Sequence, residues 1–135
     1  MARRILLIDD DDLLRAAIGE LLESSGYTVA SAGSGDAGLA MFRTARPDLV
    51  ITDLSMPGPD GIDVVRALSG AVPRPRIIAI SGGAERLDSL SGLRQAQAVG
   101  ADRILEKPFR ANALLGVVHE ILEDPGPEAG SAGAG

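Results

Sequence analysis

Three short runs of the sequence, Ile5–Ile8, Leu49–Thr52 and Ile77–Ile80, carry apolar or β-branched residues at every position. A strand with one face in water alternates apolar and polar side chains, whereas strands of a parallel sheet are covered on both faces and need not alternate. The three runs therefore predict inner strands of a parallel sheet. Two more β-prone runs are Tyr27–Ala30, which is less apolar and expected at an edge, and Ile104–Leu105.

Segments with helical periodicity separate these runs. In the first segment, Leu14, Ile18 and Leu22 recur at the spacing of one helix face. The other predicted helices are Ala37–Ala45, Ile62–Leu68, Leu90–Val99 and Ala113–Leu122. Strands that alternate with helices form an α/β fold, and the short chain favours a doubly wound, five-stranded parallel sheet of order 2-1-3-4-5 over a barrel.

Length and composition suit one small domain. We assign the folded domain to residues 1–123 and expect the Gly-, Ala- and Pro-rich residues 124–135 to be a disordered tail. The chain has no cysteine, and no apolar run approaches the roughly 20 residues of a membrane span, so we expect a cytoplasmic protein without membrane contact. The net charge of −6 argues against nucleic-acid binding by general phosphate attraction.

Polar side chains gather where the predicted strands end. Asp9 and Asp10 follow the first run, Asp53 the third and Ser81 the fourth, while Lys107 comes two residues after the fifth. Ligands of open α/β sheets bind beyond the carboxyl ends of the strands, where the strand order reverses. We therefore expect the three aspartates to lie together, with Ser81 and Lys107 on the far side of Asp53.

Three neighbouring carboxylates repel one another unless a cation lies between them. Oxygen ligands without histidine or cysteine favour Mg²⁺, or Mn²⁺, over zinc. An aspartate can attack phosphorus and form an acyl phosphate. We expect Asp53 to play this part, with the metal, Lys107 and Ser81 neutralising the phosphoryl oxygens and a backbone carbonyl near Ser55 as a further metal ligand.

Four segments, "RILLIDDDDLLR", "PDLVITDLSMPGPDG", "IIAISGG" and "GADRILEKPF", are similar to the four signatures of receiver domains of two-component response regulators. The resemblance to this CheY-like family covers about residues 3–123 and implies a flavodoxin-like (βα)5 fold of the single-domain type. By this resemblance, Asp53 is the phosphoacceptor, and Asp9, Asp10 and the Ser55 carbonyl bind Mg²⁺. Ser81 and Lys107 match the family's conserved hydroxyl and lysine, and the Lys107–Pro108 peptide bond is expected to be cis.

The resemblance also implies partners. A sensor histidine kinase or a histidine phosphotransfer protein would donate the phosphoryl group, and the face formed by helix 4, strand 5 and helix 5 would contact a downstream protein. We expect a monomer or a phosphorylation-dependent dimer, with no nucleic acid bound to this chain and no enzymatic activity beyond its own phosphorylation and dephosphorylation. One departure is Ile104, because the family often has an aromatic residue three positions before the lysine.

Two other functions fit parts of the pattern. A Mg²⁺-dependent phosphohydrolase would use Asp53 as a transient nucleophile, although Asp53-Leu54-Ser55 offers no second acid at the expected place. A degenerate receiver would act as an unphosphorylated interaction module, although the acidic set is intact. Two further polar residues have plainer roles: Asp12 is expected to be the N-cap of the first helix, and His119 a structural or solvent-facing residue of the last.

Overall fold

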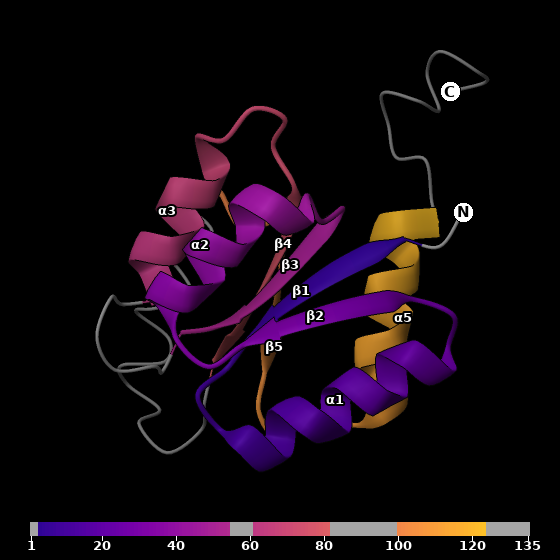
Figure 1. Ribbon diagram of the computed structural model, residues 1–135. Coiled ribbons are helices and arrows are strands. Elements are labelled where there is room, and N and C mark those ends of the chain that lie inside the picture. Colours follow the sequence, from indigo (N-terminus) through magenta and orange to yellow (C-terminus); the bar gives the residue numbers. More distant parts are fainter. Residues whose placement is uncertain (1–2, 55–60, 82–99, 124–135) are drawn as a thin grey trace, which may run out of the picture.

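The computed structural model describes residues 3–54, 61–81 and 100–123, in which strands alternate with helices as the sequence predicts (Figure 1). The strands are β1 (Arg4–Ile8), β2 (Thr28–Ala32), β3 (Leu49–Asp53), β4 (Arg76–Ser81) and β5 (Arg103–Glu106). The helices are α1 (Asp12–Ser24), α2 (Gly35–Ala45), α3 (Gly61–Ser69) and α5 (Ala111–Glu123). The predicted helix Leu90–Val99 and the tail 124–135 lie outside the described residues.

The five strands form one parallel sheet in the order β2-β1-β3-β4-β5. This confirms the predicted doubly wound arrangement, and it confirms that the second strand lies at an edge. Ile8 pairs with Thr52, and Asp53 pairs with Ile80, so the three inner strands end at nearly the same level. Whatever follows these strand ends is therefore brought to one edge of the sheet.

Helices cover both faces of the sheet, with α1 and α5 on one face and α2 and α3 on the other (Figure 1). Strand β3 shows why the inner strands do not alternate. Leu49 and Ile51 pack into the core under α1 and α5, Val50 packs into the core under α2 and α3, and all three are fully buried. Within the described part of the chain, no helix has the length and apolar character to cross a membrane.

Backbone capping sets the ends of the helices. Asp11 has an extended backbone, accepts a hydrogen bond from the backbone N–H of Leu14 and is the N-cap of α1. The prediction of Asp12 as N-cap is wrong by one residue, because Asp12 already lies inside the helix and Asp11 has the three-residue spacing to the free N–H group. Gly26, just past the end of α1, adopts a positive φ angle of 99°, as expected for a residue that follows a helix, and Gly100 has a positive φ angle of 125°.

Helix α2 approaches β1 closely at Gly38. A Cβ atom at this position would run into the side chain of Ile8, which is fully buried and has no room to move aside. Ile8 directly precedes Asp9. The missing side chain at Gly38 therefore lets the helix pack against the strand end that carries the acidic residues.

We expect Gly38→Ala to lower the free energy of unfolding by about 1–3 kcal/mol, because overpacking against Ile8 outweighs the gain in helix propensity. The matched control is Gly116→Ala in α5, where a Cβ would meet nothing within 4 Å. That change should raise the free energy of unfolding by up to about 1 kcal/mol. Urea unfolding followed by circular dichroism measures both, and equal effects of the two changes would contradict the close contact.

Candidate functional site

The residues predicted for the site lie at the carboxyl ends of the strands. Asp53 is the last residue of β3 and Ser81 the last of β4, while Asp9 directly follows β1 and Lys107 directly follows β5. The pairing of Asp53 with Ile80 puts the backbone of Ser81 one residue beyond the level of Asp53 on the neighbouring strand. The edge of the sheet thus carries three acids, a hydroxyl residue and a lysine from four strands.

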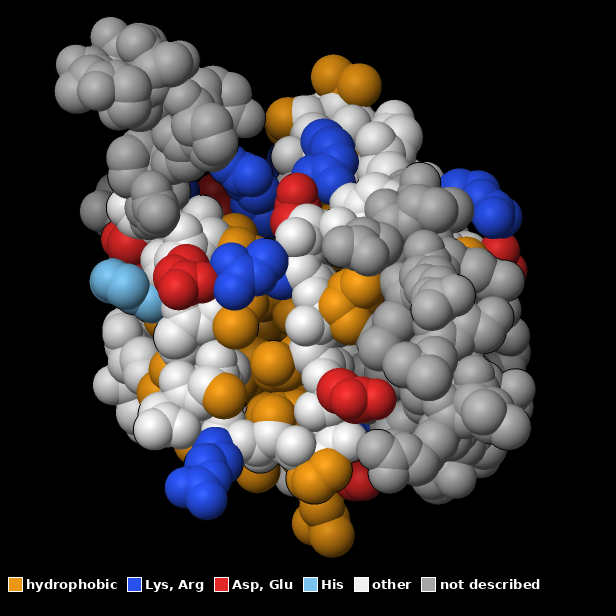
Figure 2. Space-filling model, turned by 180° about the vertical axis from the view of Figure 1, so that it is seen from behind, with side chains coloured by type: hydrophobic (Ala, Val, Ile, Leu, Met, Phe, Trp, Pro, Cys, Tyr) orange, Lys and Arg blue, Asp and Glu red, His pale blue; other side chains and the backbone are white. Residues whose placement is uncertain are grey.

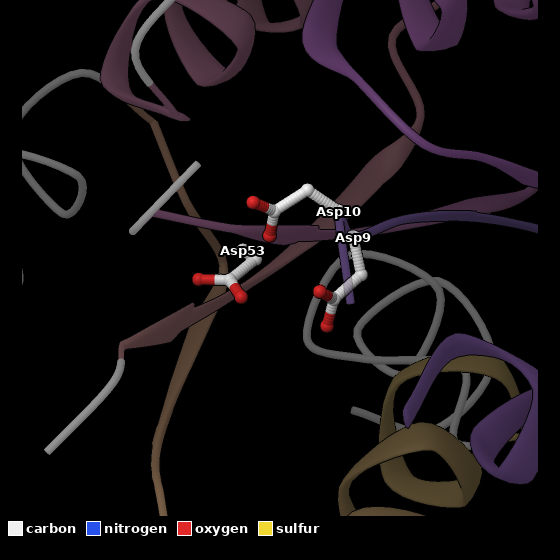
Figure 3. A group of neighbouring side chains, drawn as sticks. All are labelled: Asp9, Asp10 and Asp53. Atoms are coloured by element: carbon white, nitrogen blue, oxygen red, sulfur yellow. The ribbon is translucent and has the colours of Figure 1, made fainter. Parts of the chain in front are cut away.

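Asp9, Asp10 and Asp53 come together as expected. One carboxylate oxygen of each lies within 4.8 Å of the others. Figure 3 shows the three carboxylates beside one another at the end of the sheet. Asp9 and Asp53 are only 1 % and 3 % exposed, whereas Asp10 faces solvent. Two of the three acidic groups are therefore held away from water, where their mutual repulsion is screened least.

The two carboxylate oxygens of Asp9 differ in their partners. Its Oδ1 accepts a hydrogen bond of 2.9 Å from the backbone N–H of Asp11. Its buried Oδ2 has no hydrogen-bond partner in the described part of the structure. A buried acceptor without a partner destabilises the fold. A divalent cation would satisfy this oxygen and offset the charge of all three acids, so the residues present fit Mg²⁺.

The environment of Asp9 disfavours its ionised form. Burial raises the pKa of this carboxyl above its ordinary value of 3.8, the hydrogen bond from Asp11 opposes the rise, and the negative charge of Asp53 adds to it. A raised pKa in the folded state gives stability at low pH that is lost as the pH increases through that pKa. At neutral pH the ionised Asp9 therefore destabilises the metal-free fold.

Lys107 contacts the cluster directly. Its Nζ lies 3.0 Å from Oδ2 of Asp53 and forms a hydrogen-bonded ion pair with it. Burial lowers the pKa of Lys107, but the hydrogen bond and charge of Asp53, with the charges of Asp9 and Asp11, outweigh this effect and raise it. Lys107 thus stays positively charged and offsets part of the repulsion among the acids. The Lys107–Pro108 peptide bond is cis, as the resemblance implies.

Arg15 is a second cation at this end of the sheet, and it is not among the residues predicted for the site. Its Nη1 donates a hydrogen bond of 2.6 Å to the backbone carbonyl of Asp9, and its Nη2 pairs with Asp12 at 2.7 Å. Arg15 thereby ties the first turn of α1 to the end of β1. The only signal in the sequence is a basic residue three positions after Asp12, a spacing that is common on helix surfaces.

Not every predicted residue is described. Ser55 and the side chain of Ser81 lie outside the described part of the structure, so their roles stay predictions. His119 is exposed on α5, which agrees with a solvent-facing residue and gives it no place near the acids.

Fold and site together define an α/β domain whose parallel sheet presents a cluster of three acids, of a composition that fits a divalent cation, beyond β1 and β3. Residues 5–119 match the family model described as the response regulator receiver domain. The chain therefore belongs to the receiver-domain family of response regulators, which act in two-component signalling.

Similar curated proteins include a transcriptional regulatory protein and a DNA-binding response regulator. The transcriptional regulatory protein AfsQ1 of Streptomyces coelicolor is 36% identical over 118 residues, which cover 87% of this chain and 50% of that protein. The DNA-binding response regulator MtrA of Mycolicibacterium smegmatis is 36% identical over 122 residues, which cover 90% of this chain and 51% of that protein. The chain spans about half the length of these curated relatives.

Solved structures of receiver domains share the fold over nearly their whole length. The signal receiver domain of a response regulator from Bermanella marisrubri is 36% identical, with a TM-score of 0.81, and the match covers 90% of this chain and 99% of that one. The chemotaxis response regulator CheY4 of Vibrio cholerae is 28% identical, with a TM-score of 0.80, and the match covers 90% and 100% of the two chains.

We expect Lys107→Met to lower the free energy of unfolding of the metal-free protein by about 1–3 kcal/mol, because the buried Asp53 carboxylate loses a charged partner next to two other acids. Arg103→Met is the matched control, since its ion pair with Glu120 is exposed and contributes at most about 1 kcal/mol. Chemical denaturation in the presence of EDTA measures both. A smaller loss for Lys107→Met than for Arg103→Met would contradict the proposed neutralisation.

Proposed function

We propose that the chain accepts a phosphoryl group on Asp53 with the help of Mg²⁺ and passes on this state by protein contact. The observation that carries the proposal is the buried Asp53 carboxylate at the end of a central strand, with Lys107 Nζ 3.0 Å away and Asp9 and Asp10 beside it. A rigid strand end supplies the acceptor. The surrounding acids supply a place for a cation, and the lysine supplies a fixed positive charge.

In the proposed reaction, an ionised oxygen of Asp53 attacks the phosphorus of a phosphohistidine on a sensor histidine kinase or a histidine phosphotransfer protein. A phosphorus–oxygen bond forms as the phosphorus–nitrogen bond breaks. The bonding electron pair goes to the imidazole nitrogen, so a donor protonated on its other ring nitrogen leaves as neutral histidine. Transfer of this kind needs positioning and charge neutralisation rather than a separate acid or base.

Each residue around Asp53 has one proposed task. Asp9, Asp10, Asp53 and the Ser55 carbonyl would hold the metal, and Mg²⁺, when bound, would supply positive charge to a phosphoryl oxygen. Lys107 exchanges its hydrogen bond with Asp53 for one to a second phosphoryl oxygen. The Ser81 hydroxyl donates to the third. The same three contacts then stabilise the aspartyl phosphate until water hydrolyses it.

We infer that the chain, like receiver domains in general, is a signalling module and not an enzyme that acts on other substrates. We propose that a downstream protein contacts the face of β5 and α5 together with the predicted helix Leu90–Val99, which lies outside the described residues. Arg103 and Glu120 join β5 to α5 by an ion pair of 2.9 Å. Ile104 in β5 is half-buried against the core under α2 and α3. Because residue 104 is an isoleucine, the conformational change that follows phosphorylation would reach a downstream protein through the loops rather than through an aromatic side chain.

Incubation with Mg²⁺ and acetyl phosphate or phosphoramidate should add the mass of one phosphoryl group to the intact protein. Asp53→Asn should abolish this gain, because an amide is not a nucleophile of comparable strength. Asp36→Asn, a change of the same kind on the exposed first turn of α2, should leave it intact. Intact-mass spectrometry after rapid quenching measures all three proteins.

Three outcomes would refute this function. Phosphoryl uptake retained by Asp53→Asn would move the acceptor to another residue, and no uptake by the unchanged protein would favour an unphosphorylated interaction module. Steady turnover of a phosphomonoester, inhibited by loss of Asp53, would instead favour a phosphohydrolase.

Mg²⁺ should raise the melting temperature of the unphosphorylated protein, because it binds only the folded cluster and offsets its repulsion. Asp9→Asn and Asp10→Asn should each weaken Mg²⁺ binding by about tenfold or more. Asp11→Asn is the matched control in the same loop, since asparagine also caps a helix and residue 11 is not part of the cluster. Melting curves over a series of Mg²⁺ concentrations give the three affinities, and equal values for Asp9→Asn and Asp11→Asn would remove Asp9 from the metal site.

A further inference from the structure

The described residues line a cavity of about 850 Å³ at the end of the sheet opposite Asp53. Its lining comes from the segments that precede β1, β3 and β4 and from the last turns of α2 and α5. These segments meet at the upper end of the molecule in Figure 1. The volume lies in the range of about 300–1,000 Å³ that is typical of sites for small organic ligands.

Arginine side chains dominate the charge of this cavity. Arg3, Arg43, Arg46, Arg74 and Arg76 line it, against the two acids Asp48 and Glu123. The whole chain has only 13 basic residues and a net charge of −6. Figure 2 shows several basic side chains around the upper end of the molecule. Although the protein as a whole is acidic, positive charge is therefore concentrated around this cavity.

Three of these arginines are available to an external anion. Arg74 and Arg76 pair with Asp102 at 3.1 Å and 4.0 Å. In contrast, Arg3, Arg43 and Arg46 form no ion pair with any residue in the described ranges. Positive charge at the C-terminal end of a helix interacts favourably with the helix dipole. This accounts for Arg43 and Arg46 at the end of α2 but not for Arg3, which directly precedes β1.

The floor of the cavity is held by hydrogen bonds. The Asp48 carboxylate accepts a hydrogen bond of 2.8 Å from the backbone N–H of Arg4. The backbone carbonyl of Asp48 accepts a hydrogen bond of 3.0 Å from the backbone N–H of Arg76. The carboxylate of Asp102 accepts a bond of 2.8 Å from the backbone N–H of Ile77. Because the starts of three strands are fixed in this way, the site is preorganised and little ordering is needed on binding.

Apolar surface lies next to the arginines. Phe42, Pro47, Pro73, Pro75 and Ile121 also line the cavity. Phe42 is one of only two phenylalanines in the chain, and the whole sequence has three aromatic residues in all. Guanidinium groups recognise phosphate through paired hydrogen bonds, while an aromatic ring and proline rings offer a flat surface for a heterocycle.

We propose that this cavity binds a small organic ligand that joins a di- or triphosphate to a flat ring, of the nucleotide class. The phosphates would contact Arg3, Arg43 and Arg46, and the ring would pack on Phe42. The site is separate from the phosphoryl-transfer site in both place and chemistry, because its ligand is held by arginines and needs no Mg²⁺ cluster. The proposal therefore stands whether or not Asp53 is phosphorylated.

The test is isothermal titration of the full chain with ATP and GTP in EDTA, which keeps the acidic cluster free of metal. We expect at least one of the two to bind with one-to-one stoichiometry. The double change Arg3→Gln and Arg43→Gln should weaken this binding by about tenfold or more, since each arginine contributes charge-assisted hydrogen bonds. The matched control Arg66→Gln and Arg110→Gln removes the same charge outside the cavity and should leave the affinity unchanged.

Separate arms distinguish the two parts of the ligand. Phe42→Leu should weaken the binding of the nucleotide more than the binding of pyrophosphate. Adenosine alone should bind far more weakly than ATP. Circular dichroism verifies that each variant is folded. The proposal is overturned if neither nucleotide binds at millimolar concentration, if the control pair loses as much affinity as the cavity pair, if pyrophosphate binds as tightly as the nucleotides, or if a single-stranded oligonucleotide binds while mononucleotides do not.

Discussion

The mutual repulsion of Asp9, Asp10 and Asp53 is the constraint on which the rest of the structure depends. Two of these acids are almost completely buried, and oxygens of all three lie within 4.8 Å of one another. Such a cluster persists only because a tightly packed sheet holds the strand ends and because Lys107 and the backbone N–H of Asp11 offset part of the charge. The fold thus stores an unfavourable arrangement that a divalent cation would relieve.

Much of this could be predicted from the sequence, because burial and patterning are visible there. The continuous apolar runs predicted the inner strands, and the doubly wound fold predicted their order. The residues that follow the strands predicted where the three acids and Lys107 lie. The edge strand β5 was predicted two residues short, since its ends, Arg103 and Glu106, are exposed and carry charges that do not suggest a strand. The N-cap of α1 could not be assigned from the sequence, because Asp11 and Asp12 are identical residues in a run of four aspartates.

Contacts made by long side chains and by distant segments could not be predicted. Arg15 reaches a backbone carbonyl of the acidic loop, and no sequence pattern encodes that acceptor. The arginines of the cavity are spread over residues 3 to 76 and come together only because parallel strands all begin at one edge. The same geometry that collects acids at the carboxyl ends therefore collects these basic residues at the amino ends, and it separates the two by the length of the sheet.

The position of Asp53 within the sheet has a mechanical consequence. Its neighbours are paired on both sides, Thr52 with Ile8 of β1 and Asp53 itself with Ile80 of β4, and the backbone N–H of Leu54 donates a hydrogen bond of 2.7 Å to the carbonyl of Ile80. A residue clamped between two strands in this way has no freedom to recoil from added bulk. If Asp53 accepts a phosphoryl group as proposed, the resulting displacement would therefore be forced outward, into segments that are not part of the sheet.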